Sequence, residues 1–326
     1  MENTSTKGKR KYKKKRRTKR AKNACSPYAK NNKIVANSCF TENAVNTLTN
    51  AYNKHNPRNS IPLDKSAKDK WLDLQQKMSR IPKCDQDECW IQNIPLTYRE
   101  KAILKARLFV PPRPHEWKKD PNTWLTNFDI ENVLNQYETA YPQFRFIGPS
   151  AIDYDYQDKN RQFVCNNLQH FSVEKQLQKK QPKTGIVFNL DPHNKSGSHW
   201  VSMFIDLEDN FMFYFNSTSE PIPRQIKKFV NKVKKQCQGL NRNIEFLENT
   251  HTEHQMSNTE CGMYSLYFII TMLLREKEAA AGRRGGGKRM SKQELFDMFQ
   301  GKSSGRIKDK SMEKLRNVLY RGGTHS

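Results

Sequence analysis

The sequence predicts an α+β fold preceded by a small helical module. Segments with strand character cluster in the middle of the chain, and segments with helical periodicity lie on both sides of them. A stretch with four prolines, "VPPRPHEWKKDPN" (110–122), interrupts the pattern and is typical of a linker. We therefore predict a disordered basic tail (1–25), a helical N-terminal arm domain (26–118) and a mixed domain (119–326).

The arm domain is predicted from three helical segments. Ser38 or Thr41 can cap the first one, in which apolar residues recur at spacings of three and four: Ala44, Val45, Leu48 and Ala51. The second and third segments are "KDKWLDLQQKM" (68–78) and "LTYREKAILKARLF" (96–109). A small helical module follows from this pattern.

The mixed domain starts with a helix from Asn127 onward that places Ile130, Val133 and Leu134 on one face. Five segments then have strand character: 144–148, 184–190, 199–206, 210–216 and 244–249. A basic amphipathic helix (223–237) and a buried apolar helix that follows Cys261 complete the centre. A Gly/Arg loop (281–289) and two further helical segments close the chain.

The charge is strongly positive, with 58 Lys and Arg against 33 Asp and Glu and a net charge of +25. Residues 7–22 hold twelve of the basic residues, so the remainder still carries about +13 (25 − 12). Such a run is typical of a disordered solvated tail, and it is also compatible with a nuclear address or a non-specific nucleic-acid-binding arm.

The seven cysteines are odd in number and thinly spread, which does not predict a disulfide framework. No apolar signal segment begins the sequence, and the longest apolar run, 264–274, is shorter than the roughly 20 residues that span a bilayer. We therefore expect a soluble protein with reduced thiols. Cys84 and Cys89 lack zinc-finger spacing and are interpreted as small buried residues, so we expect no metal and no cofactor.

Cys261 stands where a polar turn becomes an apolar run, in "QMSNTECGMYSLYFIITMLL" (255–274). A buried filler and a nucleophile are both compatible with that position. A nucleophile near the start of a helix, after the capping candidates Ser257, Asn258 and Thr259, would be favoured as thiolate by the helix dipole. Gly262 would let a substrate approach the backbone, and Gln255 could donate to an oxyanion.

His199 is the best-placed base for such a cysteine. If "DLED" (206–209) is a four-residue hairpin loop, His199 lies directly opposite Asn216 and on the same face. Asn216 would then accept the Nδ1 proton of the imidazole and fix its tautomer. Asp206 lies seven residues from His199, an odd number, so it faces the other way.

These motifs resemble those of the adenain and SUMO-specific protease superfamily, in particular its viral polyprotein-processing members. The resemblance rests on "GSHWVSMFID", "YFNS" and "EHQMSNTECGMYSLYFI", and outside these motifs on "SCFTENAVNTL", "CDQDECW" and "LTNFDIENVL". It implies a papain-like cysteine protease core with a mixed sheet flanked by helices, and a protease catalytic domain over 119–326. By the same resemblance Cys261 is the nucleophile, His199 the base, Asn216 the orienter and Gln255 the oxyanion donor.

The resemblance also implies a slot for glycines, with Trp200 as one wall and Trp124 of "WLTN" as the other. Two aromatic walls would select Gly-Gly by excluding side chains. We therefore expect a viral endopeptidase that cleaves after Gly-Gly in structural polyproteins, in the virion and host cytoplasm. A deconjugase for ubiquitin-like proteins is the first alternative, and a basic nucleic-acid-binding core protein with an inactive protease fold is the second.

Overall fold

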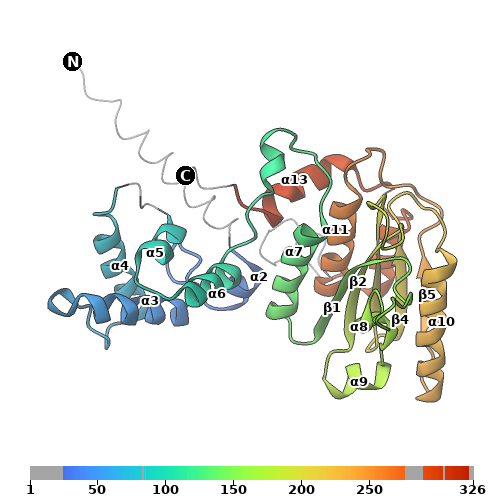
Figure 1. The fold of residues 1–326 in the computed structure, drawn as a ribbon, viewed down its shortest axis with the longest axis horizontal. Helices are drawn as coiled ribbons and strands as arrows, with labels where there is room; N and C mark the ends of the chain where they lie inside the picture. The colour runs from blue at the N-terminus through green and yellow to red at the C-terminus, as the bar shows by residue number, and fades with distance from the viewer. Residues whose placement is uncertain (1–24, 83, 85, 276–288, 304, 323–326) are drawn as a thin grey trace. The chain divides into compact units, whose positions relative to one another are not determined.

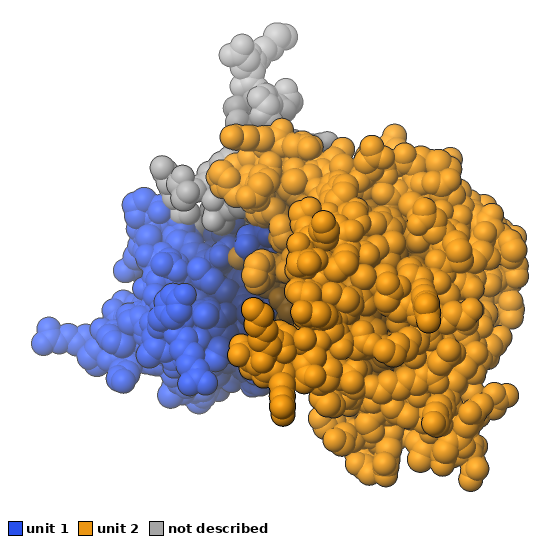
Figure 2. Space-filling view, turned by 45° about the vertical axis from the view of Figure 1, so that its right-hand side comes forward, with its two compact units in different colours: residues 1–112, 323–326 blue, residues 113–322 orange. Residues whose placement is uncertain are grey.

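The computed structural model describes residues 25–275, 289–303 and 305–322, except residues 83 and 85. The predicted basic tail, except Cys25, and most of the predicted Gly/Arg loop lie outside this range. Cys25 is buried and paired with Cys39, so it belongs to the first unit and not to a tail. The chain forms two compact units, one ending at Pro112 and the other running from Arg113 to Gly322 (Figure 2). The sequence predicts this boundary at residue 118. Trp117 packs its ring 5.0 Å from that of Tyr320, and the Arg113 amide donates to the Arg321 carbonyl at 2.9 Å, which ties this segment to the second unit.

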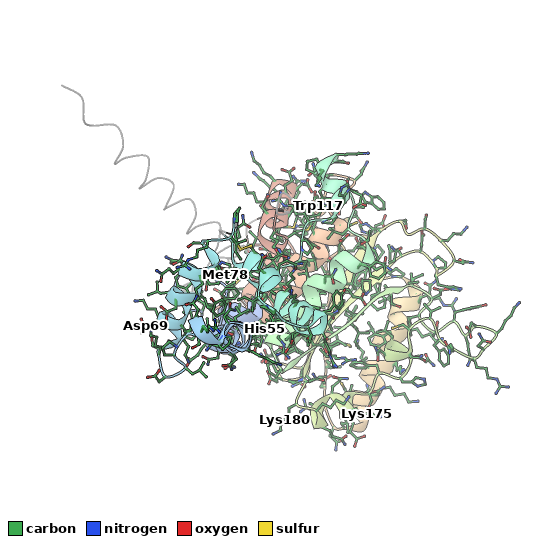
Figure 3. All side chains as sticks on the ribbon, turned by 60° about the vertical axis from the view of Figure 1, so that its left-hand side comes forward. His55, Asp69, Met78, Trp117, Lys175 and Lys180 are labelled. Atoms are coloured by element: carbon green, nitrogen blue, oxygen red, sulfur yellow. A yellow bond between two sulfur atoms is a disulfide. The ribbon has the colours of Figure 1, made fainter. Side chains whose placement is uncertain are left out.

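Unit 1 is helical. Its helices are α2 (Pro27–Asn31), α3 (Glu42–His55), the 3-10 turn η1 (Pro57–Asn59), α4 (Ala67–Met78), α5 (Asp87–Asn93) and α6 (Tyr98–Leu108). Thr41, one of the two predicted caps, is the N-cap of α3, and its hydroxyl oxygen accepts a hydrogen bond from the Ala44 amide. The apolar faces meet around an aromatic cluster in which the Trp90 ring lies 5.5 Å from Phe40 and 5.7 Å from Trp71. Met78, at the end of α4, joins this core (Figure 3).

Four of the seven cysteines are paired, so the expectation of reduced thiols is wrong for them. Disulfides join Cys25 to Cys39 and Cys84 to Cys89, with Cα–Cα distances of 5.1 and 5.4 Å. Cysteine spacing did not show these pairs, because the approach of Cys25 to Cys39 depends on how the segments pack in unit 1. Cys165, Cys237 and Cys261 are free thiols.

Unit 2 contains a five-stranded mixed sheet in the order β1-β2-β3-β4-β5. The strands are β1 (Phe144–Ala151), β2 (Lys183–Asn189), β3 (Trp200–Asp206), β4 (Phe211–Phe215) and β5 (Glu245–Glu248). The two outer pairs are parallel and the two inner pairs are antiparallel. The helical elements of the unit are η2 (His115–Lys118), α7 (Asn127–Ala140), α8 (Asn166–Gln169), α9 (Val173–Gln178), α10 (Arg224–Gly239), α11 (Cys261–Leu274), α12 (Lys292–Phe299) and α13 (Asp309–Leu319). The predicted α+β class is confirmed.

Both faces of the sheet are buried. Along β4, Phe211, Phe213 and Phe215 belong to the core shared with α7, α11, α12 and α13, whereas Met212 and Tyr214 belong to the core shared with α9 and α10. Figure 1 shows α7 and α11 on one side of the sheet and α10 on the other. Alternate side chains serve opposite layers because successive residues of a strand point to opposite faces.

Helix α11 packs closely on the sheet at a glycine. A Cβ on Gly185 of β2 would lie 2.8 Å from an Ile269 methyl and 2.9 Å from the Phe144 ring. The absence of a side chain at Gly185 therefore allows α11 to pack at a short distance from the sheet. This close packing holds the helix that begins with Cys261. None of the helices within the described ranges has the length and apolar character needed to cross a membrane.

Candidate active site

The β3–β4 hairpin brings His199 and Asn216 together in a register that differs from the prediction. Asp206 pairs with Phe211 and Ser202 with Phe215, so the turn is 207–210 and the register has moved by two residues. A shift of two residues keeps every side chain on its face, whereas a shift of one would have reversed it. His199 therefore meets Asn216 diagonally and not directly, and the contact survives.

The imidazole of His199 is turned the opposite way from our prediction. Nε2, and not Nδ1, donates to the Asn216 side-chain oxygen, at 2.8 Å. Nδ1 is then the basic nitrogen of the neutral ring. Burial lowers the pKa of His199, and the hydrogen bond to Asn216 and the nearby Glu220 carboxylate oppose that shift. A neutral base is therefore favoured.

Asn216 is fully buried and held on several sides. Its side-chain oxygen also accepts from the amide of Thr218 at 3.1 Å and from the Thr218 hydroxyl at 2.8 Å. Its backbone exchanges two hydrogen bonds with the side chain of Asn249, at 2.8 and 2.7 Å. No motif in the sequence predicted this role of Asn249. Its position at the end of a predicted strand, just after residue 248, was the only available signal.

Cys261 is the first residue of α11 and is buried. The capping candidates Ser257, Asn258 and Thr259 do not cap this helix, since its N-cap is Glu260, whose side chain makes no capping bond. Burial raises the pKa of the Cys261 thiol, while the backbone amides of Trp200, Gly262 and Cys261 itself donate toward the sulfur and lower it. Trp200, the residue that follows His199, belongs to the same buried core as Cys261. Because the thiol and the imidazole are both shifted toward their neutral forms, the thiol needs a base at the moment of reaction.

Gln255 is buried and its amide is oriented by two bonds. Its oxygen accepts the Ser217 hydroxyl at 2.7 Å, and its nitrogen donates to the Ser257 carbonyl at 2.6 Å. The Gln255 backbone amide also donates to the Ser217 carbonyl, which lies next to Asn216 in the chain. One amide proton remains for another acceptor. No motif in the sequence predicted the role of Ser217, whose hydroxyl donates to the Gln255 side-chain oxygen and thereby orients the amide.

The predicted substrate residues lie together around Leu125. The Trp200 indole N–H donates to the Leu125 carbonyl at 3.0 Å, and the ring is only 8% exposed. Trp124, the preceding residue, is 40% exposed. A Cβ on Gly262 would lie 3.0 Å from the Leu125 Cβ, so this glycine gives room to Leu125. Their predicted contacts with substrate stay predictions.

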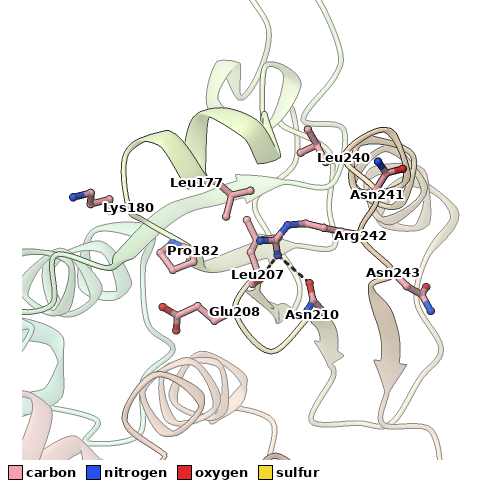
Figure 4. Close-up of a pocket in the computed structure, with 10 residues that line it drawn as sticks. All are labelled: Leu177, Lys180, Pro182, Leu207, Glu208, Asn210, Leu240, Asn241, Arg242 and Asn243. Carbon is pink, nitrogen blue, oxygen red and sulfur yellow. Dashed lines mark hydrogen bonds between the residues drawn. The ribbon is translucent and has the colours of Figure 1, made fainter.

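The opposite end of the hairpin carries charges. Asp206 does not contact His199, as predicted. It is fully buried and pairs with Lys183 at 2.6 Å and with Arg275 at 3.2 Å. Beside this turn lies an open hollow of about 880 Å³ whose lining includes Glu208, Lys180 and Arg242 (Figure 4). Arg242 is already bonded there to the Leu207 carbonyl and the Asn210 side chain. The hollow includes no cysteine or histidine, so we place the candidate site at the other end of the hairpin.

A metal-dependent site finds no support in the described part of the chain, where no group of three or more His, Cys, Asp or Glu side chains could hold an ion. The nearest carboxylate to the nucleophile in sequence, Glu260, is engaged in an ion pair with Arg316 at 3.0 Å.

Comparisons with known proteins identify the family to which the chain belongs. Residues 122–317 match the Ulp1 protease family, C-terminal catalytic domain. A thiol protease of Acanthamoeba polyphaga mimivirus is 27% identical over 268 residues, which cover 78% of this chain and 85% of that protein. A SUMO-1 cysteine protease of African swine fever virus is 32% identical over 207 residues, which cover 58% of this chain and 73% of that protein.

A crystal structure of the African swine fever virus protease has the same fold. Its TM-score is 0.55 at 24% sequence identity, and the match covers 78% of this chain and 89% of that chain. Through its catalytic domain, with a cysteine at the start of a buried helix beside a His–Asn pair, the chain belongs to the Ulp1 protease family and is a cysteine peptidase.

Proposed function

We propose that this chain is a viral cysteine endopeptidase that cleaves after Gly-Gly in structural polyproteins. The observation that carries the proposal is the hydrogen-bonded His199–Asn216 pair, which is followed in the chain by Trp200, a residue of the same buried core as Cys261. In the proposed reaction Nδ1 of His199 takes the thiol proton while the sulfur attacks the scissile carbonyl carbon. The imidazolium then gives its proton to the leaving amine, and water later hydrolyses the thioester.

Gln255 would stabilise the oxyanion in this scheme. The free proton of its amide would donate to the developing negative charge together with the Cys261 backbone amide, which belongs to the start of α11. Asn216 would hold the ring in place without a net charge. A neutral orienter stabilises imidazolium less than a carboxylate does, which is consistent with a resting site in neutral form.

The proposed preference for glycine rests on the surroundings of Leu125. Trp124 and Trp200 flank the segment that covers Gly262, so an extended substrate entering beside Cys261 would pass close to aromatic side chains. Residues without side chains would fit where larger ones are excluded. The viral assignment is supported by unit 1. Unit 2 holds 210 of 326 residues, or 64%, so the mimiviral protease match over 78% of the chain must extend into unit 1.

The test is cleavage of matched peptides by purified protein. Peptides with an internal Gly-Gly-Xaa, Gly-Ala-Xaa or Ala-Gly-Xaa should be compared with a fusion of SUMO to a reporter, with Cys261→Ser as the inactive control. Selective cleavage of Gly-Gly-Xaa peptides supports the endopeptidase proposal. Efficient cleavage of only the folded SUMO fusion would favour the deconjugase, and equal cleavage of all three peptides would refute the glycine selectivity.

We also propose that the protein binds nucleic acid without sequence preference, through residues 7–22 together with α10. The tail lies outside the described residues, but α10 offers a described basic surface. This helix has six Lys or Arg and no acidic residue. Lys228 pairs with Asp155, whereas within the described ranges Arg224, Lys227 and Lys235 have no carboxylate at ion-pair distance. Lys175 and Lys180 add positive charge at the adjacent α9 (Figure 3).

Retention on immobilised duplex DNA at increasing salt would test this second proposal. Deletion of residues 1–22 should remove most retention, and Lys227→Gln with Lys235→Gln should remove part of what is left, because each lost phosphate contact lowers affinity and its salt dependence. Peptide cleavage should not change. Unchanged retention by the combined variant would refute the assignment. A nucleic-acid-bound form is compatible with the proposed location in the virion and host cytoplasm, and with a nuclear stage.

A further inference from the structure

A single buried guanidinium connects the two segments that form the candidate site. Arg316 of α13 is only 3% exposed. Its Nε donates to both oxygens of Glu260, at 3.1 and 3.0 Å. Nη1 donates to the Thr123 carbonyl at 2.9 Å, and Nη2 donates to the Thr259 carbonyl at 3.2 Å. Bonds from one rigid fork to both segments fix their separation.

The faces of this guanidinium are also used. Its central carbon lies 4.6 Å from the centroid of the Trp117 ring, a cation–π contact. Trp117 packs edge-to-face on Tyr320, one residue beyond α13. The plane of the Arg316 fork is therefore set by packing as well as by hydrogen bonds. A lysine could keep the charge, but it could not reproduce this plane or the paired bonds.

The two connected segments lead directly to the reacting residues. Thr123 precedes Trp124 and Leu125, and Leu125 holds the Trp200 indole and covers Gly262. Thr259 and Glu260 precede Cys261. A small movement of either segment would change the width of the space between the Leu125 segment and the nucleophile.

Glu260 needs this partner on electrostatic grounds. It is buried beside Cys261, and burial raises the pKa of its carboxyl while Arg316 lowers it. An uncompensated negative charge at this place would oppose thiolate formation next to it. Arg316 therefore neutralises the Glu260 carboxylate, the same group that accepts its two Nε hydrogen bonds.

We propose that Arg316 is a positioning residue, which sets the distance between the Leu125 segment and the Cys261 turn and thereby the selectivity for glycine. The selectivity part rests on the proposed Gly-Gly function. The positioning part does not, because it concerns two segments of the chain and can be measured without substrate.

The chain contains a matched control at the other end of α11. Arg275 follows the last residue of that helix, and it pairs with the buried Asp206 and with Asp209. Both arginines thus join a buried carboxylate at an end of the same helix, but only Arg316 does so beside the nucleophile. Arg316→Lys and Arg275→Lys should be compared in the full chain, and Glu260→Gln tests the same pair if Arg316→Lys does not fold.

The first measurement is hydrogen–deuterium exchange of the folded proteins. Arg316→Lys should raise exchange in peptides that cover 119–126 and 255–262, and Arg275→Lys should raise it only around 204–210 and 272–275. The second measurement is kcat/KM on Gly-Gly-Xaa and Ala-Gly-Xaa peptides. Arg316→Lys should lower kcat on the Gly-Gly-Xaa peptide by about 100-fold, the usual effect of a misplacement near 1 Å. The ratio of kcat/KM on Gly-Gly-Xaa to kcat/KM on Ala-Gly-Xaa should also become smaller.

The proposal would be overturned if exchange in 119–126 and 255–262 did not rise in Arg316→Lys. It would also be overturned if Arg316→Lys and Arg275→Lys lost the same degree of selectivity for Gly-Gly. If the unmodified enzyme shows no preference for Gly-Gly, the proposed function fails, and the exchange measurement still decides whether Arg316 positions the two segments.

Discussion

The two ends of the β3–β4 hairpin differ in how their polar groups are satisfied. At the turn, Asp206 is buried and pairs with Lys183 and Arg275, and its second oxygen accepts the amides of Glu208 and Asp209 at 3.0 and 3.1 Å. At the open end, His199 and Asn216 form a neutral hydrogen bond at 2.8 Å.

This difference is the reason why we place the proposed chemistry at the open end. The charges at the turn already have partners, so they stabilise the fold and have little left to offer a substrate. The open end keeps a basic ring nitrogen, a spare amide proton on Gln255 and a thiol, all of them in neutral groups. The hollow beside the turn is large, but the size of a cavity does not supply a nucleophile.

The largest expected effect is at the open end. Cys261→Ser and His199→Ala should each lower turnover by up to about a million-fold, as loss of the nucleophile or base does in hydrolase triads. Cys237→Ser, which changes a buried free thiol on the far side of the sheet, should retain activity and serves as the control. Near-normal turnover by folded Cys261→Ser would contradict the assigned nucleophile.

The turn end should respond in stability and not in chemistry. Asp206→Asn leaves Lys183 and Arg275 without their buried carboxylate, so we expect the free energy of unfolding to fall by about 3–5 kcal/mol. Urea unfolding measures this change. Glu208→Gln, which removes an exposed partner of Lys183, should cost less than about 1 kcal/mol. A large loss of kcat in folded Asp206→Asn would erase the contrast between the two ends.

Variants of Gln255 and Ser217 distinguish stabilisation of the oxyanion from orientation of the donor amide. Gln255→Ala should lower kcat by about 100- to 1000-fold with little change in KM, the usual effect of removing an oxyanion donor. Ser217→Ala should have a smaller effect in the same direction, because Ser217 only orients the amide through a 2.7 Å bond. Steady-state kinetics on a Gly-Gly-Xaa peptide measures both. Equal KM and kcat changes in Gln255→Ala would instead indicate a binding residue.

The smallest expected effect is on the pH profile. The pKa of His199 is lowered mainly by burial, so the neutral base should persist below the ordinary histidine value of about 6.5, and kcat/KM should fall only as the pH drops through the lowered pKa. Asn216→Asp places a negative charge against Nε2 and should move this acid limb to higher pH. An unchanged limb in that variant would show that another group controls it.

Local patterns in the sequence determined much of the fold. Spacings of three and four placed α3 and α7, the helical character of 68–78 and 96–109 placed α4 and α6, and strand-like apolar segments placed the five strands of the mixed sheet. Parity along β3 put His199 and Asp206 on opposite faces, because side chains alternate strictly along a strand. The predicted hairpin register was wrong by two residues, an even number, so Asn216 still lies on the face of His199. The junction at Cys261 marked the start of α11 correctly.

The tertiary structure decided the rest, because those features depend on distances between segments far apart in the chain. The hairpin register was set by the pairing of β3 with both of its neighbours, and the ring orientation of His199 by where Asn216 lies in space. Asn249, Ser217 and Arg316 act on residues up to 193 positions away, as with Arg316 and Thr123. Local periodicity can be recognised in one sequence because it depends on neighbouring residues. Hydrogen-bond partners that are distant in the chain can be identified only when packing brings their groups together.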